Sequence, residues 1–197
     1  MNLNEDIQLD VAEVGEKILG RWAEIRRHTR SAIEEKELFK PEGASMEEHR
    51  EWALKSLKTL VKQNATQYGF PEELGGQRNP GGSLSSFEEL ILGDASLQIK
   101  FGVQWGLFGS AILNLGTDYH HTTFLPAVTR LDTPGCFAMT ETGHGSDVAS
   151  IGTTATYDPA TQEFVVHTGP SQLQGLHRQC RSPRRGSCGL CPAIHRG

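Results

Sequence analysis

Over the first two thirds of the chain, apolar positions recur three or four residues apart, which is the spacing of a helix with one buried face. In residues 7–38 this spacing predicts one helix face, formed by Ile7, Val11, Val14, Ile18, Trp22 and Ile25. Ser45 and Glu48 have the spacing of a capping box, and the apolar positions after them predict a second helix. The N-terminal part of the chain is therefore expected to form a helical bundle.

A glycine-rich stretch and a second capping pattern follow. Residues 69–82 hold five glycines and two prolines, which predicts a long ordered loop. Capping-box spacing then recurs in the pairs Ser85–Glu88 and Ser86–Glu89, which predicts a helix start there. The helix face that follows consists of Phe87, Leu90, Ile91, Asp94 and Leu97.

Residues 99–115 predict the most apolar helix of the chain. They overlap a run of 17 uncharged residues, 101–117, which we interpret as a buried helix rather than a membrane span. Small residues stand four apart at Gly102, Gly106 and Ser110. This spacing lets another backbone approach closely, so we expect the helix to lie inside the bundle.

The pattern then changes from helical to alternating. Residues 119–130 predict one last short helix, interrupted at Pro126. Alternating β-prone stretches follow at 136–141, 150–157 and 163–168. Asp158 and Pro159 mark a turn between the last two. Three short strands cannot close a sheet, so the predicted antiparallel unit is unfinished.

Composition excludes several classes of protein. The chain has 197 residues, of which 37% are apolar, enough for a domain with a core and too many for a disordered chain. Its net charge is −5, so nucleic acid is not an expected partner. No apolar signal sequence opens the chain, and a single cysteine before residue 171 suits a reducing compartment.

The densest chemical signal lies in residues 137–147. Two glycines stand there among three hydroxyl residues: Gly143, Gly145, Thr140, Thr142 and Ser146. Such a loop offers bare backbone N–H groups and short hydroxyls to a polar, planar or anionic ligand. The loop lacks the lysine of a P-loop and the dinucleotide-binding GxGxxG pattern, and a plain glycine turn in a hairpin is the alternative.

This segment, Phe-Ala-Met-Thr-Glu-Thr-Gly-His-Gly-Ser-Asp-Val, resembles the flavin-binding strand and loop of the acyl-CoA oxidase and acyl-CoA dehydrogenase superfamily. With Pro-Gly-Cys before it, the segment is closer to the oxidases. Residues 101–110, Phe-Gly-Val-Gln-Trp-Gly-Leu-Phe-Gly-Ser, resemble the buried helix that precedes this loop in the oxidases. The resemblance covers roughly residues 5–168.

The resemblance implies a helical domain, then a β-barrel-like domain, then C-terminal helical domains, with FAD between the last two. For this chain it implies a mainly α fold: a helical domain over 1–134, the start of an incomplete antiparallel β-barrel-like domain over 135–169 and an irregular tail over 170–197. It also implies that five loop residues contact FAD, namely Phe137, Met139, Thr140, Gly145 and Ser146. Ser146 is expected to lie near the acyl-CoA as well.

The implied reaction is FAD-dependent α,β-dehydrogenation of acyl-CoA thioesters, the first step of fatty acid β-oxidation, with O2 as electron acceptor. Relatives of this kind are homo-oligomers; a bacterial member would be cytoplasmic and a eukaryotic one peroxisomal. Two alternatives stay open. The chain could be a dehydrogenase with another electron acceptor, or a non-catalytic shortened paralogue that binds a full-length relative.

The resemblance assigns no catalytic residue to this chain. The family's base is a glutamate in the C-terminal helical domain, so we expect the chain to be truncated and to have little activity alone. Glu141 matches a motif glutamate that is not the base, and we expect it to be structural. We expect His144 to be a hydrogen-bonding loop residue and Asp94 to be a satisfied carboxylate on a helix face.

The last 27 residues do not fit the rest. Residues 171–197 carry five Arg, no Lys, Asp or Glu, and three of the four cysteines. Family members continue instead with a strand like Lys-x-Tyr-Ile-Gly-Asn. Codons assigned from Leu173 onward and read one base later give Ser-Lys-Asp-Tyr-Ile-Gly-Asn-Ala-Ala-Val-His. We therefore expect an out-of-frame tail, which the DNA sequence tests, rather than the zinc site suggested by Cys188 and Cys191 or an RNA-binding arginine cluster.

Overall fold

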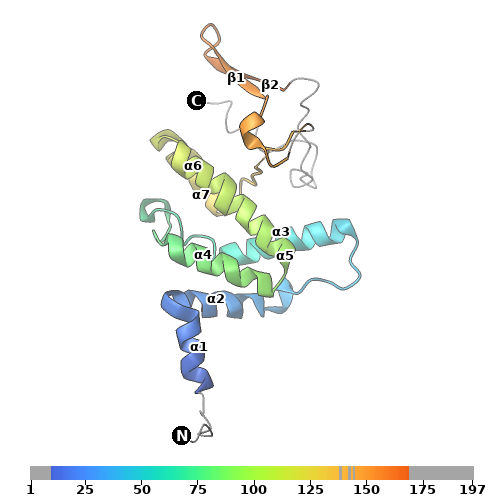
Figure 1. Ribbon diagram of the computed structural model, residues 1–197, viewed down its shortest axis with the longest axis vertical. Coiled ribbons are helices and arrows are strands. Elements are labelled where there is room, and N and C mark those ends of the chain that lie inside the picture. Colours follow the sequence, from blue (N-terminus) through green and yellow to red (C-terminus); the bar gives the residue numbers. More distant parts are fainter. Residues whose placement is uncertain (1–9, 138, 142, 144, 169–197) are drawn as a thin grey trace, which may run out of the picture. The chain divides into compact units, whose positions relative to one another are not determined.

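The computed structural model describes residues 10–137, 139–141, 143 and 145–168 (Figure 1). The chain divides into two units, Met1–Gln98 and Ile99–Gly197. Helices make up most of the described structure, and a two-stranded antiparallel sheet follows them, which confirms the mainly α fold. The domain boundary expected after residue 134 stays a prediction. No described helix is both long enough and apolar enough to cross a membrane.

The first unit holds α1 (Val11–Leu19), α2 (Ala23–Ile33), α3 (Met46–Lys62), α4 (Pro80–Glu89) and the start of α5 (Ala95–Phe101). Short 3-10 turns lie between them at Gly20–Trp22, Lys36–Leu38, Glu72–Leu74 and Leu90–Leu92. The helix face predicted over 7–38 is divided at Gly20, whose φ of 63° lies in the left-handed region and ends α1. No described residue of the predicted face is buried: Val11, Val14 and Ile18 are exposed, and Trp22 and Ile25 are half-buried. The buried residues of α2 are instead Thr29, Ala32 and Ile33.

The capping box predicted at the start of α3 is confirmed. The Glu48 N–H donates to Ser45 Oγ at 3.3 Å, and the Glu48 carboxylate accepts the Ser45 N–H at 2.8 Å. Hydrogen bonds from the Ser45 hydroxyl and N–H lower the pKa of Glu48. Behind this cap, α3 buries Trp52, Leu57 and Leu60 in the core of the first unit.

Helix α4 begins at Pro80, earlier than the sequence predicts. Asn79 caps it, since the Asn79 side-chain oxygen accepts the Gly82 N–H at 2.8 Å, and a proline in the first turn has no N–H to satisfy. The capping boxes predicted at Ser85 and Ser86 are wrong, because both serines lie inside the helix and are buried. The glycine-rich loop therefore ends at Asn79.

The second unit holds the end of α5, a π-helical segment (Gly102–Gly109), α6 (Ser110–Leu115), α7 (Asp118–Thr129), β1 (Thr154–Asp158) and β2 (Glu163–His167). The buried residues of α5 and the π-helical segment are Leu97, Phe101, Gln104, Trp105, Phe108 and Gly109. At Gly106 the expected close contact is absent from the described structure. A Cβ added to Gly106 would meet no heavy atom of the described residues within 4 Å.

Helix α7 continues through Pro126, so the predicted interruption is wrong. Leu125 and Val128, which flank the proline, are both completely buried. Tertiary packing of these two side chains offsets the cost of the hydrogen bond that proline cannot donate.

The hairpin is confirmed at the two later β-prone stretches. β1 and β2 pair antiparallel with Tyr157 opposite Phe164, and the predicted turn lies between the strands. The strand predicted over 136–141 is wrong, since its described residues form only a single bridge, at Glu141. A strand needs a hydrogen-bonded neighbour, and within the described chain β1 and β2 pair only with each other.

Candidate functional site

The loop between α7 and β1 is fixed at its start by one buried carboxamide. Gln104 Oε1 accepts the Gly135 N–H at 2.8 Å, while Gln104 Nε2 donates to the carbonyls of Thr133 at 3.0 Å and Val128 at 3.3 Å. One side chain of the π-helical segment thus satisfies three backbone groups. Because buried polar groups are costly when unpaired, this arrangement fixes the path by which the chain enters the loop.

Two aromatic side chains of the same segment complete this anchor. Trp105 Nε1 donates to the carbonyls of Val128 at 3.2 Å and Thr129 at 3.3 Å. Phe108 packs so closely on Gly135 that an added Cβ would lie 1.9 Å from its ring. Position 135 therefore requires glycine because the Phe108 ring leaves no room for a side chain, and not because of a backbone conformation that only glycine adopts. π-helical segments are rare in proteins overall, but those that occur are often found at functional sites. The position of residues 102–109 beside the loop agrees with this tendency.

Glu141 anchors the other end of the loop. Its side chain is buried, and its carboxylate accepts the Gly152 N–H at 3.0 Å, the Thr153 N–H at 2.8 Å and the Thr153 hydroxyl at 2.6 Å. The Thr153 and Thr168 hydroxyls share a further hydrogen bond of 3.0 Å. These contacts give Glu141 the structural role predicted from the sequence, since its oxygens already bind groups of the protein.

The residues predicted to contact a cofactor lie between or just beyond these anchors. Phe137, Gly145 and Ser146 are exposed, whereas Met139 and Thr140 are half-buried. A Cβ added to Gly143 or Gly145 would meet no described heavy atom within 4 Å. The loop therefore combines fixed ends with an open, hydroxyl-bearing middle. The roles of the five residues stay predictions, and His144 lies outside the described residues.

Asp94 lies in the first unit and caps α5. Its Oδ1 accepts the Ser96 N–H at 2.7 Å and the Leu97 N–H at 3.2 Å, and its Oδ2 lies 3.9 Å from Lys40 Nζ. Burial alone would raise the pKa of Asp94, but the hydrogen bonds from Ser96 and Leu97 outweigh it and lower that pKa. The prediction of a satisfied carboxylate is confirmed.

Gln104 is the functional residue that the sequence interpretation missed. The only signal was a polar side chain in an otherwise apolar run, which is also typical of an exposed helix position. Metal binding has no support in the described residues, where no group of His, Cys, Asp or Glu could hold an ion. Cys188 and Cys191 lie outside those residues.

Several known proteins are similar to this chain in sequence. Residues 23–132, more than half of the chain, match the sequence model of a family described as acyl-CoA dehydrogenase, N-terminal domain. Acyl-coenzyme A oxidase 2, peroxisomal, from Arabidopsis thaliana is 37% identical over 133 residues, 67% of this chain and 18% of that protein. A putative acyl-coenzyme A oxidase 3.2, peroxisomal, from the same plant is 33% identical over 181 residues, 84% of this chain and 26% of that protein. The chain spans about a fifth to a quarter of the length of these relatives.

Solved structures of acyl-CoA dehydrogenases also resemble this chain. A glutaryl-CoA dehydrogenase from Mycobacterium smegmatis matches 78% of this chain and 40% of its own, with a TM-score of 0.62 and 26% identity. An acyl-CoA dehydrogenase complexed with FAD from Bacillus anthracis matches 74% of this chain and 24% of its own, also with a TM-score of 0.62. At 20% identity, the second likeness shows the fold alone.

Proposed function

Because the chain belongs to the family of the acyl-CoA dehydrogenase N-terminal domain, we propose that it supplies the helical domain and a flavin-binding loop of an acyl-CoA oxidase-like enzyme. The proposed reaction removes one hydrogen from each of Cα and Cβ of an acyl-CoA thioester, with O2 as the electron acceptor. This is the first step of fatty acid β-oxidation. The names of the curated relatives support acyl-CoA oxidase chemistry over other flavin chemistry.

The observation that carries this proposal is the loop anchored at both ends. Gln104 holds its start and Glu141 holds its end, so the backbone between them is held on both sides. Phe137 presents an exposed ring there, and no atom of the described chain would lie within 4 Å of a Cβ added to Gly145. A planar ring with polar edges fits a loop that offers an aromatic face, hydroxyls and bare backbone.

In the proposed complex, Phe137 and Met139 line the flavin and the Thr140 hydroxyl hydrogen-bonds its polar edge. Gly145 and Ser146 close the loop beside the flavin and the acyl-CoA. FAD, when bound, supplies the hydride acceptor, and hydrogen bonds to its ring tune that acceptance. The chain's own contribution is to position the ring and to exclude water from one of its faces.

Proton abstraction from Cα needs a carboxylate within hydrogen-bond reach of that carbon. Glu141 and Asp94 are both committed to backbone N–H groups. We assign the base to neither of them.

FAD binding by the full 197-residue chain tests the proposal. We expect saturable quenching of flavin fluorescence, and we expect Thr140→Val to weaken FAD binding about fivefold, the effect of one neutral hydrogen bond. Thr156→Val on β1 is the matched control, because Thr156 lies outside the loop, and it should bind FAD like the wild type. No saturable binding by the folded chain, or an equal loss in both variants, contradicts the proposal.

A turnover assay tests where the base lies. The FAD-loaded chain is given a long-chain acyl-CoA in air, and hydrogen peroxide is measured against a full-length acyl-CoA oxidase. We expect much slower turnover than the full-length enzyme shows. Equal rates would show that a carboxylate of this chain is the base. Reduction of a dye without peroxide would replace the oxidase assignment by a dehydrogenase.

A further inference from the structure

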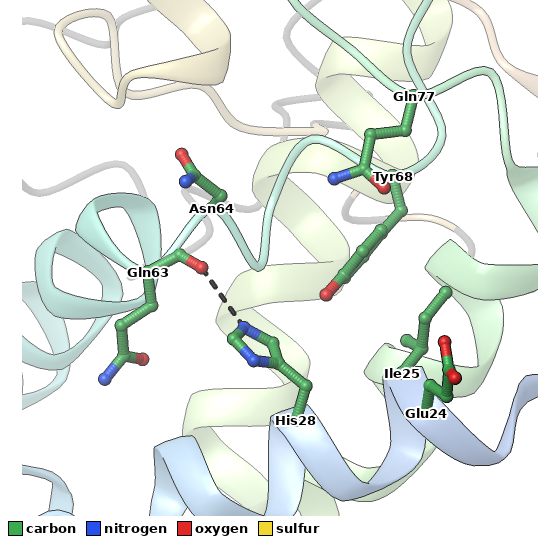
Figure 2. Close-up of a pocket in the computed structure, with 7 residues that line it drawn as sticks. All are labelled: Glu24, Ile25, His28, Gln63, Asn64, Tyr68 and Gln77. Atoms are coloured by element: carbon green, nitrogen blue, oxygen red, sulfur yellow. Dashed lines mark hydrogen bonds between the residues drawn. The ribbon is translucent and has the colours of Figure 1, made fainter.

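The first unit contains a pocket of about 330 Å³ that the proposed reaction does not use (Figure 2). One wall comes from α2 and the other from the end of α3 and the loop that leads to α4. Its lining consists of Glu24, Ile25, His28, Gln63, Asn64, Tyr68 and Gln77. This volume is at the small end of the range for ligand sites in proteins.

Hydrogen bonds within the protein hold the pocket walls in place. His28 Nε2 donates to the Gln63 carbonyl at 3.2 Å, which ties α2 to the end of α3, and Figure 2 marks this contact. In the loop, the Gln77 N–H donates to the Gln67 carbonyl at 3.2 Å, and the Asn79 N–H donates to the Tyr68 carbonyl at 2.6 Å. The walls are therefore formed before any ligand binds.

Tyr68 is the feature that points to a ligand. Its side chain is only 7% exposed, and Figure 2 shows its hydroxyl end directed into the pocket toward α2. No hydrogen bond joins that hydroxyl to any residue of the described chain. Burial raises the pKa of Tyr68, so the hydroxyl keeps its proton and can donate. The hydroxyl itself is reached by solvent, so a ligand that accepts its hydrogen bond takes the place of water there.

The chemistry of the lining selects the ligand. Three side chains are carboxamides, Gln63, Asn64 and Gln77, and one, Glu24, is a carboxylate. None of the seven lining residues is Lys or Arg, so the pocket offers no lysine or arginine charge to a phosphate or a carboxylate. A carboxamide presents a donor beside an acceptor, which is the complement of another amide.

We propose that this pocket binds a small uncharged amide or lactam, with the Tyr68 hydroxyl as the donor at its floor. The carboxamides of Asn64 and Gln77 pair with the ligand's amide group at the rim. Ile25 supplies an apolar surface for the ring or chain of the ligand. The carboxylate of Glu24 disfavours the binding of a carboxylate ligand of the same shape.

Nicotinamide and nicotinate are the probes that test the proposal. They have the same ring, but nicotinamide carries an amide where nicotinate carries a carboxylate. Ligand-observed NMR titration of the full chain should show that nicotinamide binds and that nicotinate binds at least tenfold more weakly. Tyr68→Phe should weaken nicotinamide binding about fivefold, because it removes one neutral hydrogen bond. Because the hydroxyl donates to no residue of the described chain, its removal should not lower the melting temperature of the variant.

Two variants keep the test specific. Tyr119→Phe on α7 changes an exposed tyrosine that does not line the pocket, and nicotinamide binding should stay within about twofold of the wild type. Glu24→Gln should raise nicotinate binding and leave nicotinamide binding unchanged. The proposal is overturned if nicotinamide does not bind, if Tyr68→Phe binds it as tightly as the wild type, or if glucose binds and nicotinamide does not.

Discussion

Two buried polar side chains, Gln104 and Glu141, place the candidate flavin loop by binding backbone groups rather than ligand. Gln104 fixes the chain where it enters the loop, and Glu141 fixes it near the start of β1. Neither side chain is needed for the proposed chemistry itself. Their substitution should therefore act through the position and stability of the loop.

The fit of Phe108 against Gly135 leads to a first prediction. Gly135→Ala forces a Cβ into the phenyl ring and should destabilise the chain by about 1–3 kcal/mol, the usual cost of overpacking. Thermal unfolding of the variant measures this loss. Gly145→Ala is the control, since its Cβ would meet no described atom within 4 Å. Equal melting temperatures for the two variants would contradict the close packing.

Glu141 carries the second prediction. In Glu141→Gln a single amide oxygen replaces two carboxylate oxygens, so a half-buried N–H group of Gly152 or Thr153 loses its acceptor. The amides of Gly152 and Thr153 should then exchange with deuterium about tenfold faster, as expected for a loss of about 1.4 kcal/mol. Glu163→Gln on exposed β2 is the control and should leave both rates unchanged.

For single residues, the sequence predicts a side chain's role well when its hydrogen-bond partner is close in the chain, and poorly when the partner is far away. Asp94 and Ser45 could be assigned because their partners are two or three residues away, within a cap. Gln104 could not, because its partners are backbone groups 24 to 31 residues further along the chain. A contact of that range depends on how α7 packs, which no local pattern records.

Among the elements, the contact between α2 and α4 shows why local signals can mislead. Ser86, predicted to cap a helix, instead shares a buried hydrogen bond of 2.9 Å with Thr29 of α2. A Cβ on Gly82 would lie 2.4 Å from the Ile25 side chain of α2, so a glycine predicted to lie in a loop is a residue that lets α4 approach α2. Propensity predicted a loop there, and tertiary packing overrode it.

An ion-pair network joins the same two helices and gives a prediction for pH. Buried Glu89 accepts from Arg26 at 2.7 Å and from Arg30 at 2.6 Å. Burial opposes ionisation, but the hydrogen bonds from Arg30 and Arg26 outweigh it and lower the pKa of Glu89. The folded-state pKa is thus below the unfolded one. The stabilisation is complete above the unfolded value of about 4.3 and is lost as the pH falls through the folded value.

Glu89→Gln should therefore cost about 2 kcal/mol near neutral pH, less than a fully buried pair because Arg30 is partly exposed. Urea unfolding at several pH values measures the difference from the wild type, which should shrink on acidification. Glu88→Gln is the control, since Glu88 also binds Arg26 but is half-exposed, and its effect should be smaller. A difference that does not change with pH would contradict the lowered pKa.

For the whole chain, the feature to explain is the exposed apolar surface of the β hairpin. Its register places four apolar residues on one face, Ala155, Tyr157, Phe164 and Val166, and mostly polar residues on the other. All four are exposed, and the rings of Tyr157 and Phe164 lie 5.2 Å apart. The alternating pattern predicted this amphipathic hairpin, and within the described structure no third strand pairs with it.

Two neighbouring valines of β2 test whether that face is a continuous patch. Val165 and Val166 are each 56% exposed, but Val166 extends the apolar face beside Phe164, whereas Val165 stands opposite Thr156 on the polar one. Val166→Ser should therefore lower the fluorescence of bound anilinonaphthalene sulfonate and raise the solubility of the full chain, since contiguous apolar patches drive association. Val165→Ser removes the same area from a mixed surface and should change both quantities less. If the two variants behave alike, total exposed area rather than its continuity on one face determines how the chain associates.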